Sequence, residues 1–147
     1  MTRQAARAAW PSAAPPAARD ELFWDLSGLA ELPRVRTDVR LFAMEQDRGS
    51  GPDPADLHDR LVLALDEMAS NALRHGGGGV RATLGSTADA WLIDVSDRAP
   101  TRPPSPAIGR DPSEGGLGLY LIAELGTAHG WYAGDGCKHV WALIPRR

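Results

Sequence analysis

Four consecutive glycines at positions 76–79 separate two kinds of sequence pattern. Before them, apolar residues recur with the period of a helix, and after them apolar and polar residues alternate as in a strand. Asp53 can cap such a helix, Pro54 suits its first position, and Asp56 suits its positive end. The apolar stripe consists of Leu57, Leu61, Ala64, Leu65, Met68 and Ala72. We therefore expect a long amphipathic helix that starts near Asp53 and stops at the glycines.

Two segments after the glycines have the alternation of half-buried strands. Their apolar residues are Val80, Ala82 and Leu84 in the first segment and Trp91, Ile93 and Val95 in the second. Residues 85–89 can form the turn between them, which predicts an antiparallel hairpin. A second hairpin is expected near the C-terminus, where residues 131–132 and 139–144 flank a Gly-Asp-Gly turn.

Three further elements complete the predicted fold. Residues 23–26 form a short aromatic strand, residues 32–46 carry apolar residues at helical spacing, and a third helix is expected over residues 116–127. No internal repeat is present. This order of helices and strands predicts an α+β fold, a two-layer sandwich with helices on one face of a mixed, mainly antiparallel sheet.

Composition limits the function classes that the chain can serve. Its 147 residues, 43% hydrophobic and 24% charged, fit one domain with a single core. A formal charge of -3 leaves no basic excess for a phosphate backbone, so we expect no direct nucleic-acid binding. No apolar run approaches the roughly 20 residues of a membrane span. With Cys137 as the only cysteine, we expect a cytoplasmic protein without a disulfide or a multi-cysteine zinc site.

Two segments differ in composition from the rest of the chain. Residues 1–20 are dominated by Ala, Pro and Arg, with Trp10 as the only large apolar group, which predicts a disordered tail before a domain over residues 21–147. A transit peptide is disfavoured because so many prolines prevent an amphipathic helix. Residues 99–115 are rich in proline and can be neither helix nor central strand. We interpret this long loop as a functional lid.

Glu67 and Asn71 are four residues apart on the long helix and therefore neighbours on its surface. At about 100° per residue, Asn71 lies roughly 70° and Glu67 roughly 110° from the middle of the apolar stripe, so both border the core. A carboxamide oxygen there can bind Mg²⁺, and a carboxylate can accept a proton. The alternative is that both residues simply occupy the wet edge of an amphipathic helix.

Residues 65–76, with the sequence LDEMASNALRHG, resemble the N box of the GHKL ATPases, in the form typical of bacterial anti-sigma factor serine kinases. The resemblance implies a Bergerat-type ATP-binding fold with ATP and Mg²⁺ as cofactors. It gives Glu67 the role of general base and Asn71 that of the Mg²⁺ ligand bridging the nucleotide phosphates. His75 matches the family's histidine, for which packing is favoured over a nucleotide contact.

Asp97 ends the second predicted strand, where an aspartate can accept a hydrogen bond from the amine of adenine. In the resembled family this aspartate opens a D-x-G-x-G motif. Here it is followed by Arg98, Ala99, Pro100 and Thr101, so the glycines are missing. The adenine contact therefore stands beside a second interpretation, a turn-capping aspartate.

The start of the third predicted helix resembles the family's second glycine box, where backbone N–H groups approach phosphates. Its residues are Gly115, Gly116, Leu117, Gly118 and Leu119. Leu117 stands where many members carry arginine, which makes Arg110 in the lid the candidate substitute unless that side chain is merely solvated. Residues 136–142 resemble the closing strand of the family, with His139 where a Thr or Ser often stands. The resemblance spans roughly residues 32–145.

Two functions follow from the resemblance. The first is a serine/threonine protein kinase that phosphorylates an anti-sigma factor antagonist of the STAS type and regulates transcription by partner switching, with a sigma factor as a second candidate partner and a homodimer as the implied assembly. Such a reaction requires mainly positioning and charge neutralisation. The second, motivated by the missing glycines after Asp97, is a non-catalytic ATP-dependent binding module. A histidine kinase is disfavoured because 147 residues leave no room for a phosphoacceptor domain.

Overall fold

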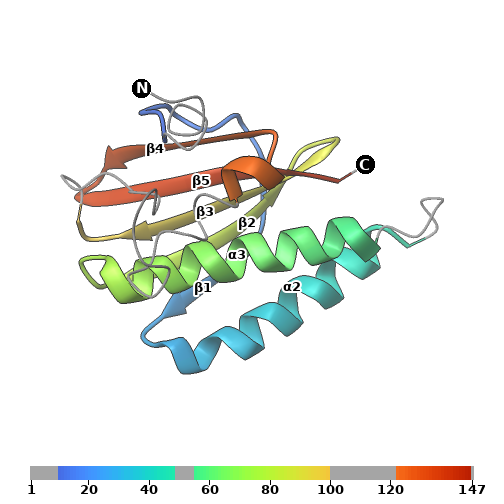
Figure 1. The fold of residues 1–147 in the computed structure, drawn as a ribbon, viewed down its shortest axis with the longest axis horizontal. Coiled ribbons are helices and arrows are strands. Elements are labelled where there is room, and N and C mark those ends of the chain that lie inside the picture. Colours follow the sequence, from blue (N-terminus) through green and yellow to red (C-terminus); the bar gives the residue numbers. More distant parts are fainter. Residues whose placement is uncertain (1–9, 49–54, 100–121, 147) are drawn as a thin grey trace.

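The computed structural model describes residues 10–48, 55–99 and 122–146 (Figure 1). The strands are β1 (Arg19–Leu26), β2 (Val80–Ser86), β3 (Ala90–Asp97), β4 (Ala128–Gly134) and β5 (Cys137–Pro145). The helices are the short 3-10 helix η1 (Leu29–Glu31) and the long helices α2 (Leu32–Gln46) and α3 (Ala55–His75). Both predicted hairpins and the helix over residues 32–46 are confirmed, and the first strand is longer than predicted.

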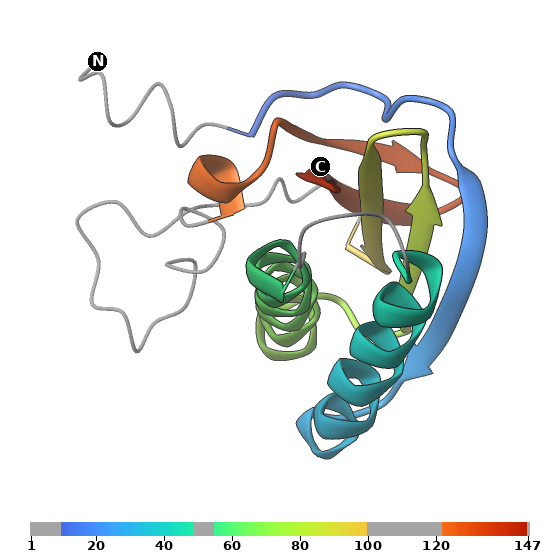
Figure 2. The ribbon, with the colours of Figure 1, turned by 90° about the vertical axis from the view of Figure 1, so that its right-hand side faces the viewer.

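The strands form one sheet in the order β1-β2-β3-β5-β4, and every neighbouring pair is antiparallel. Figures 1 and 2 show α2 and α3 together on one face of this sheet. The predicted α+β fold with helices on one face is therefore confirmed. Within the described ranges, the only parallel pairing is an isolated bridge between Ser12 and Trp131 at the β4 edge.

The core lies between the sheet and the two long helices. Strand alternation turns Trp91, Ile93 and Val95 of β3 toward the helices, where all three are at most 2% exposed. The stripe on α3 meets them, with Leu61 and Leu65 at most 1% exposed. Each large side chain buried in this way contributes about 1.5–3 kcal/mol relative to exposure. This layer fixes the position of α3, which carries Glu67 and Asn71.

Helix α3 stops where the glycines begin. The Gly76 N–H donates to the Ala72 carbonyl at 2.8 Å, and the chain then turns through Gly78 and Gly79, whose φ angles are 83° and 60°. Residues that carry a side chain rarely adopt positive φ angles, so glycine is required where the chain leaves the helix. The predicted end of the helix is confirmed, whereas its predicted start at Asp53 lies outside the described residues.

Residues 10–18 cross the face of the sheet that the helices leave open (Figure 2). Trp10 is 7% exposed with its ring centroid 4.6 Å from that of His129, and the Trp141 Nε1–H donates to the Ala13 carbonyl at 2.8 Å. The backbone of Ala13 also pairs with Trp131 on the edge strand β4. The predicted disordered tail is therefore wrong for residues 10–20. Burial of Trp10 and pairing with the open edge of β4 offset the entropic cost of ordering this segment, and its composition does not reveal either contact.

Two predicted features fall largely outside the described ranges. Of the third predicted helix, residues 122–125 are helical, and the remainder up to position 121 is not described. The same holds for nearly all of the predicted lid. In the part of the chain that the structure describes, no helix is both long and apolar enough to cross a membrane.

Candidate nucleotide site at the end of α3 and β3

Glu67 and Asn71 both lie partly buried on α3, at the border of the core that their helical positions predict. The residues between them, Met68, Ala69 and Ser70, are all buried. Burial raises the pKa of the Glu67 carboxyl, the negative charge of Asp66 raises it further, and Arg74 opposes the shift. A carboxylate with a raised pKa binds a proton more tightly, which suits a general base.

Asp97 is the last residue of β3 and is 2% exposed. Its Oδ1 accepts a hydrogen bond from the Ala99 N–H at 2.7 Å, which is the turn-capping contact. Its Oδ2 lies beside the end of α3, because a Cβ built on Gly76 would stand only 2.6 Å from that oxygen. Asp97 thus caps its own turn and also reaches the helix that carries Asn71.

The glycines at 76–79 let the end of α3 and the end of β3 approach closely. A Cβ on Gly77 would meet the Arg98 carbonyl carbon at 2.8 Å, and the Arg98 N–H donates to the Gly78 carbonyl at 3.0 Å. Asn71 lies five residues before Gly76, about 7.5 Å along the helix axis. The glycine run therefore holds Asn71 and Asp97 at one end of the sandwich.

Lys138 lies beside Asp97, although no sequence motif assigned it a role. It stands directly opposite Asp97 in the pairing of β3 with β5, and its Nζ lies 3.5 Å from Asp97 Oδ2. The side chains are 9% and 3% exposed, so this ion pair is nearly dry. One signal was available in the sequence: Lys138 is the only lysine among its 16 lysines and arginines.

His139, which the resemblance aligns with a Thr or Ser of the closing strand, lies on the other face of the sheet. Its ring stacks on Tyr132 with centroids 4.5 Å apart, and its Nδ1 lies 3.0 Å from Asp94 Oδ1. The hydrogen bond to Asp94 raises the pKa of His139 against the opposing effect of burial. Lys138, and not His139, is therefore the β5 residue beside Asp97.

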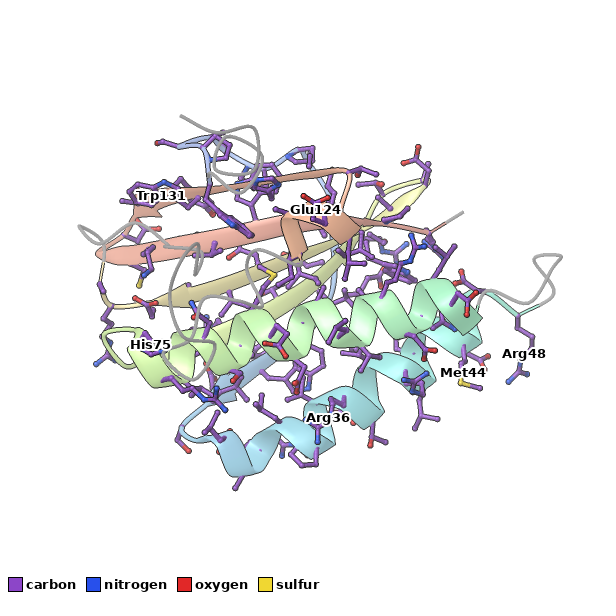
Figure 3. All side chains as sticks on the ribbon, viewed as in Figure 1. Arg36, Met44, Arg48, His75, Glu124 and Trp131 are labelled. Atoms are coloured by element: carbon purple, nitrogen blue, oxygen red, sulfur yellow. The ribbon has the colours of Figure 1, made fainter. Side chains whose placement is uncertain are left out.

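Of the other predicted site residues, the structure describes only His75. His75 is the exposed last residue of α3, at the same end of the molecule as Trp131 on β4, and Met44 and Arg48 mark the opposite end (Figure 3). Arg110, Gly115, Gly116, Leu117, Gly118 and Leu119 lie outside the described residues, so the predicted phosphate side of the site stays a prediction. The residues that the structure brings together are Asp97 and Lys138, beside the end of α3 at Gly76, while Asn71 and Glu67 lie further back along that helix.

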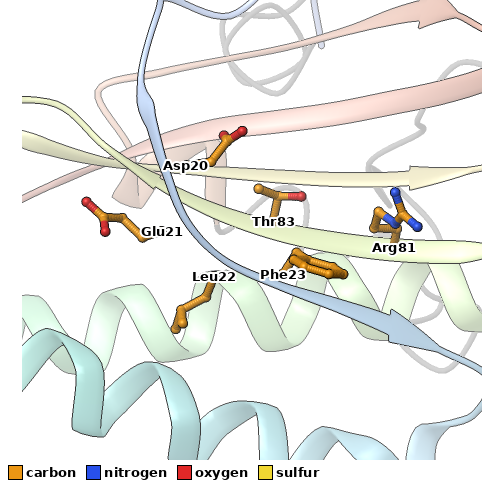
Figure 4. Close-up of a pocket in the computed structure, with 6 residues that line it drawn as sticks. All are labelled: Asp20, Glu21, Leu22, Phe23, Arg81 and Thr83. Carbon is orange, nitrogen blue, oxygen red and sulfur yellow. The ribbon is translucent and has the colours of Figure 1, made fainter.

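Three surface clefts lie away from this site. One of about 430 Å³ runs along β1, where Arg81 lies over the exposed ring of Phe23 while Leu22 points toward the helices (Figure 4). Another of about 340 Å³ lies between residues 15–18 and the open face of the sheet. The third lies on α2 beside Leu41. None of the three is lined by Glu67, Asn71 or Asp97.

Comparison with known protein families identifies the family of the domain. A family model described as "Histidine kinase-like ATPase domain" matches residues 29–144, which covers both long helices and nearly all of β5. No curated protein matches the chain. Because the match covers most of the sequence, the chain belongs to the histidine kinase-like ATPase domain family. It is an ATP-binding, kinase-like ATPase domain.

The site residues fit a nucleotide with its metal ion. Asn71 supplies a hard oxygen of the kind that Mg²⁺ takes in addition to phosphate oxygens. The glycine run leaves backbone uncovered at the end of α3, where any side chain on Gly76 would meet Asp97. In the described residues, no group of three or more His, Cys, Asp or Glu side chains could hold a metal by itself. Asn71 would hold a metal here together with oxygens of the nucleotide.

Proposed function

We propose that this chain is an ATP- and Mg²⁺-dependent serine/threonine protein kinase that phosphorylates an anti-sigma factor antagonist of the STAS type. The observation that carries the proposal is the environment of Glu67, a half-buried carboxylate with a raised pKa, one helical turn from Asn71 on the nucleotide helix. A carboxylate of this kind can serve as the proton acceptor that such a transfer needs.

In this proposal each side chain has a distinct task. Glu67 accepts the proton of the acceptor serine or threonine hydroxyl as the hydroxyl oxygen bonds to the terminal phosphorus of ATP, and the bond from that phosphorus to the bridging oxygen breaks so that ADP leaves. Asn71 would hold Mg²⁺, and the bound ion would supply positive charge to offset the charge of the phosphates. Asp97 accepts a hydrogen bond from the adenine amine and so positions the nucleotide along the helix. Arg110 and the glycine box at residues 115–119 complete the proposed phosphate contacts.

A second function is favoured by the surroundings of Asp97. Its two carboxylate oxygens already contact the Ala99 N–H and the Lys138 ammonium, and the glycines of the family motif are absent after it. These features suit a non-catalytic module that binds ATP to hold a partner. In either case a sigma factor is the proposed second partner, and a homodimer is the proposed assembly.

Phosphate transfer separates the two functions. Purified chain is incubated with Mg²⁺, radiolabelled ATP and a panel of purified STAS-domain proteins, and the label on each is measured. The kinase should label a serine or threonine of at least one of them, and Glu67→Gln should lose this labelling while keeping its affinity for ATP. Ser70→Ala, three residues along the same helix, is the control. Labelling that persists in the Glu67 variant would contradict the assigned base.

A further inference from the structure

Lys138 stands out in both composition and position. Every other basic residue of the sequence apart from histidine is an arginine, and the one lysine is 7% exposed inside the fold. Lysines are almost never this buried unless they are paired. The pairing with Asp97 satisfies that requirement, but an arginine could also pair with a carboxylate, and more strongly through its two-pronged geometry.

The lysine ammonium differs from an arginine guanidinium in the N–H donors that remain free for other acceptors once it is paired with a carboxylate. It is a compact charge with three N–H donors that can point in different directions. One donor directed at Asp97 leaves two for other acceptors. Asp97 Oδ2 likewise keeps accepting capacity beside its 3.5 Å contact with Lys138, because a carboxylate oxygen has two lone pairs. The pair therefore presents an acceptor and a donor side by side.

We propose that Lys138 is a specificity-determining residue for the nucleotide base, donating to ring nitrogen N1 of adenine while Asp97 accepts from the adjacent amine. The inference rests on the proposed role of Asp97 in ATP binding. Adenine has a donor and an acceptor next to each other on this edge, in the order that the Asp97–Lys138 pair complements. Two charge-assisted hydrogen bonds would then fix the base instead of one.

The same arrangement rejects guanine in that orientation. Guanine has a carbonyl oxygen where adenine has its amine, and an N–H where adenine has N1. The carbonyl would face the Asp97 carboxylate and the N–H would face the Lys138 ammonium, so both contacts become repulsive. Mismatched polar groups in a desolvated site discriminate more strongly than differences in shape. The pair thus selects ATP over GTP without the missing glycines of the family motif.

Equilibrium binding of 1-deaza-ATP, in which N1 is replaced by C–H, tests the inference on the full chain. Titration calorimetry with Mg²⁺ should show wild type binding ATP at least about tenfold more tightly than 1-deaza-ATP, the value of one hydrogen bond to a charged donor. Lys138→Met should bind both nucleotides with the same reduced affinity. His139→Gln changes the adjacent residue, which lies on the other face of the sheet, and should keep the wild-type ratio.

The single lysine also gives a direct readout that needs no variant. Protein labelled with ¹⁵N at the lysine ζ position has one side-chain signal from Lys138, and this signal should shift with ATP and stay in place with 1-deaza-ATP. Equal affinities of wild type for the two nucleotides, or tighter ATP binding by Lys138→Met, would overturn the inference.

These outcomes are distinct from failure of the kinase proposal. ATP binding with the N1 preference but without phosphate transfer contradicts only the kinase. Equal binding of ATP and 1-deaza-ATP together with phosphate transfer contradicts only the role of Lys138. A wild-type chain that binds neither nucleotide contradicts both. Circular dichroism of Lys138→Met establishes that a lost affinity is not lost folding.

Discussion

Strands β3 and β5 carry two acid–base pairs that lie on opposite faces of the same sheet. Asp97 and Lys138 face the helices with side chains 3% and 9% exposed, whereas Asp94 and His139 face residues 15–18 with side chains 19% and 24% exposed. Their chemistry is similar, and they are close in the chain, since His139 follows Lys138 and Asp94 lies three residues before Asp97. Strand alternation alone separates them, and burial then leaves one pair nearly dry and the other partly exposed to solvent.

This contrast predicts different costs for breaking the two pairs. Asp97→Asn leaves a buried ammonium without its counter-charge and should lower the free energy of unfolding by about 3–5 kcal/mol. Asp94→Asn should cost less than about 1 kcal/mol, as for exposed pairs. Urea denaturation followed by circular dichroism measures both. An equal loss of free energy of unfolding in the two variants would show that burial does not set the energetic cost of breaking each pair.

A double variant sharpens the comparison. Asp97→Asn combined with Lys138→Met removes both charges of the nearly dry pair, so it should be more stable than Asp97→Asn alone. The same cycle with Asp94→Asn and His139→Gln should show coupling of at most about 0.5–1 kcal/mol. A double variant of the nearly dry pair that is no more stable than the single variant would mean that the two side chains do not interact.

The segment over the open face should contribute to stability by burial instead of charge. Trp10→Ala removes a side chain that is 7% exposed and packs on His129. We expect a loss of about 3 kcal/mol, at the lower end for buried aromatic residues, because the site lies at the edge of the sheet. Phe23→Ala is the control, since that ring is 65% exposed. An unchanged midpoint of urea denaturation for Trp10→Ala would contradict an ordered, packed segment over residues 10–18.

The close approach of α3 and β3 predicts a smaller effect at the glycines. Gly76→Ala places a Cβ 2.5 Å from the Ala72 carbonyl oxygen and 2.6 Å from Asp97 Oδ2, so the site must open. We expect a loss of about 1–3 kcal/mol, as for overpacked cores, together with weaker ATP binding. Gly28→Ala, which meets nothing within 4 Å, should leave ATP affinity unchanged. Wild-type affinity in Gly76→Ala would show that this approach does not shape the site.

The pair on the open face predicts a small dependence of stability on pH. Asp94 raises the pKa of His139 in the folded state, so the stabilisation is fully present below the unfolded pKa, whose ordinary value is 6.5, and is lost as the pH rises through the folded pKa. Tyr132, with a pKa raised to about 12, stays protonated throughout this window. Wild type should therefore exceed Asp94→Asn in stability at pH 5.5, and the difference should shrink by pH 8.5. A difference that grows with pH would contradict the hydrogen bond.

Local patterns predicted the elements of this fold but not the contacts between distant segments. Periodicity gave α2 its observed bounds and the glycines gave the end of α3, because helices and their exits depend on neighbouring residues. Composition failed for residues 10–20, whose order depends on the distant edge strand β4. Lys138 lies beside Asp97 because of the register between β3 and β5. The two residues are 41 positions apart along the chain, so no local pattern specifies this pairing. The positions of Glu67 and Asn71 at the border of the core could be predicted because both lie on one helix.

In the proposed function, α3 carries a nucleotide site in which Asn71 binds Mg²⁺. Calorimetric titration of wild type and Asn71→Ala with ATP, each with and without Mg²⁺, tests it directly. Wild type should bind ATP far more tightly with Mg²⁺ than without it, and Asn71→Ala should lose that gain while its circular dichroism spectrum stays unchanged. Equal heats for the two proteins in the presence of Mg²⁺ would contradict the claim.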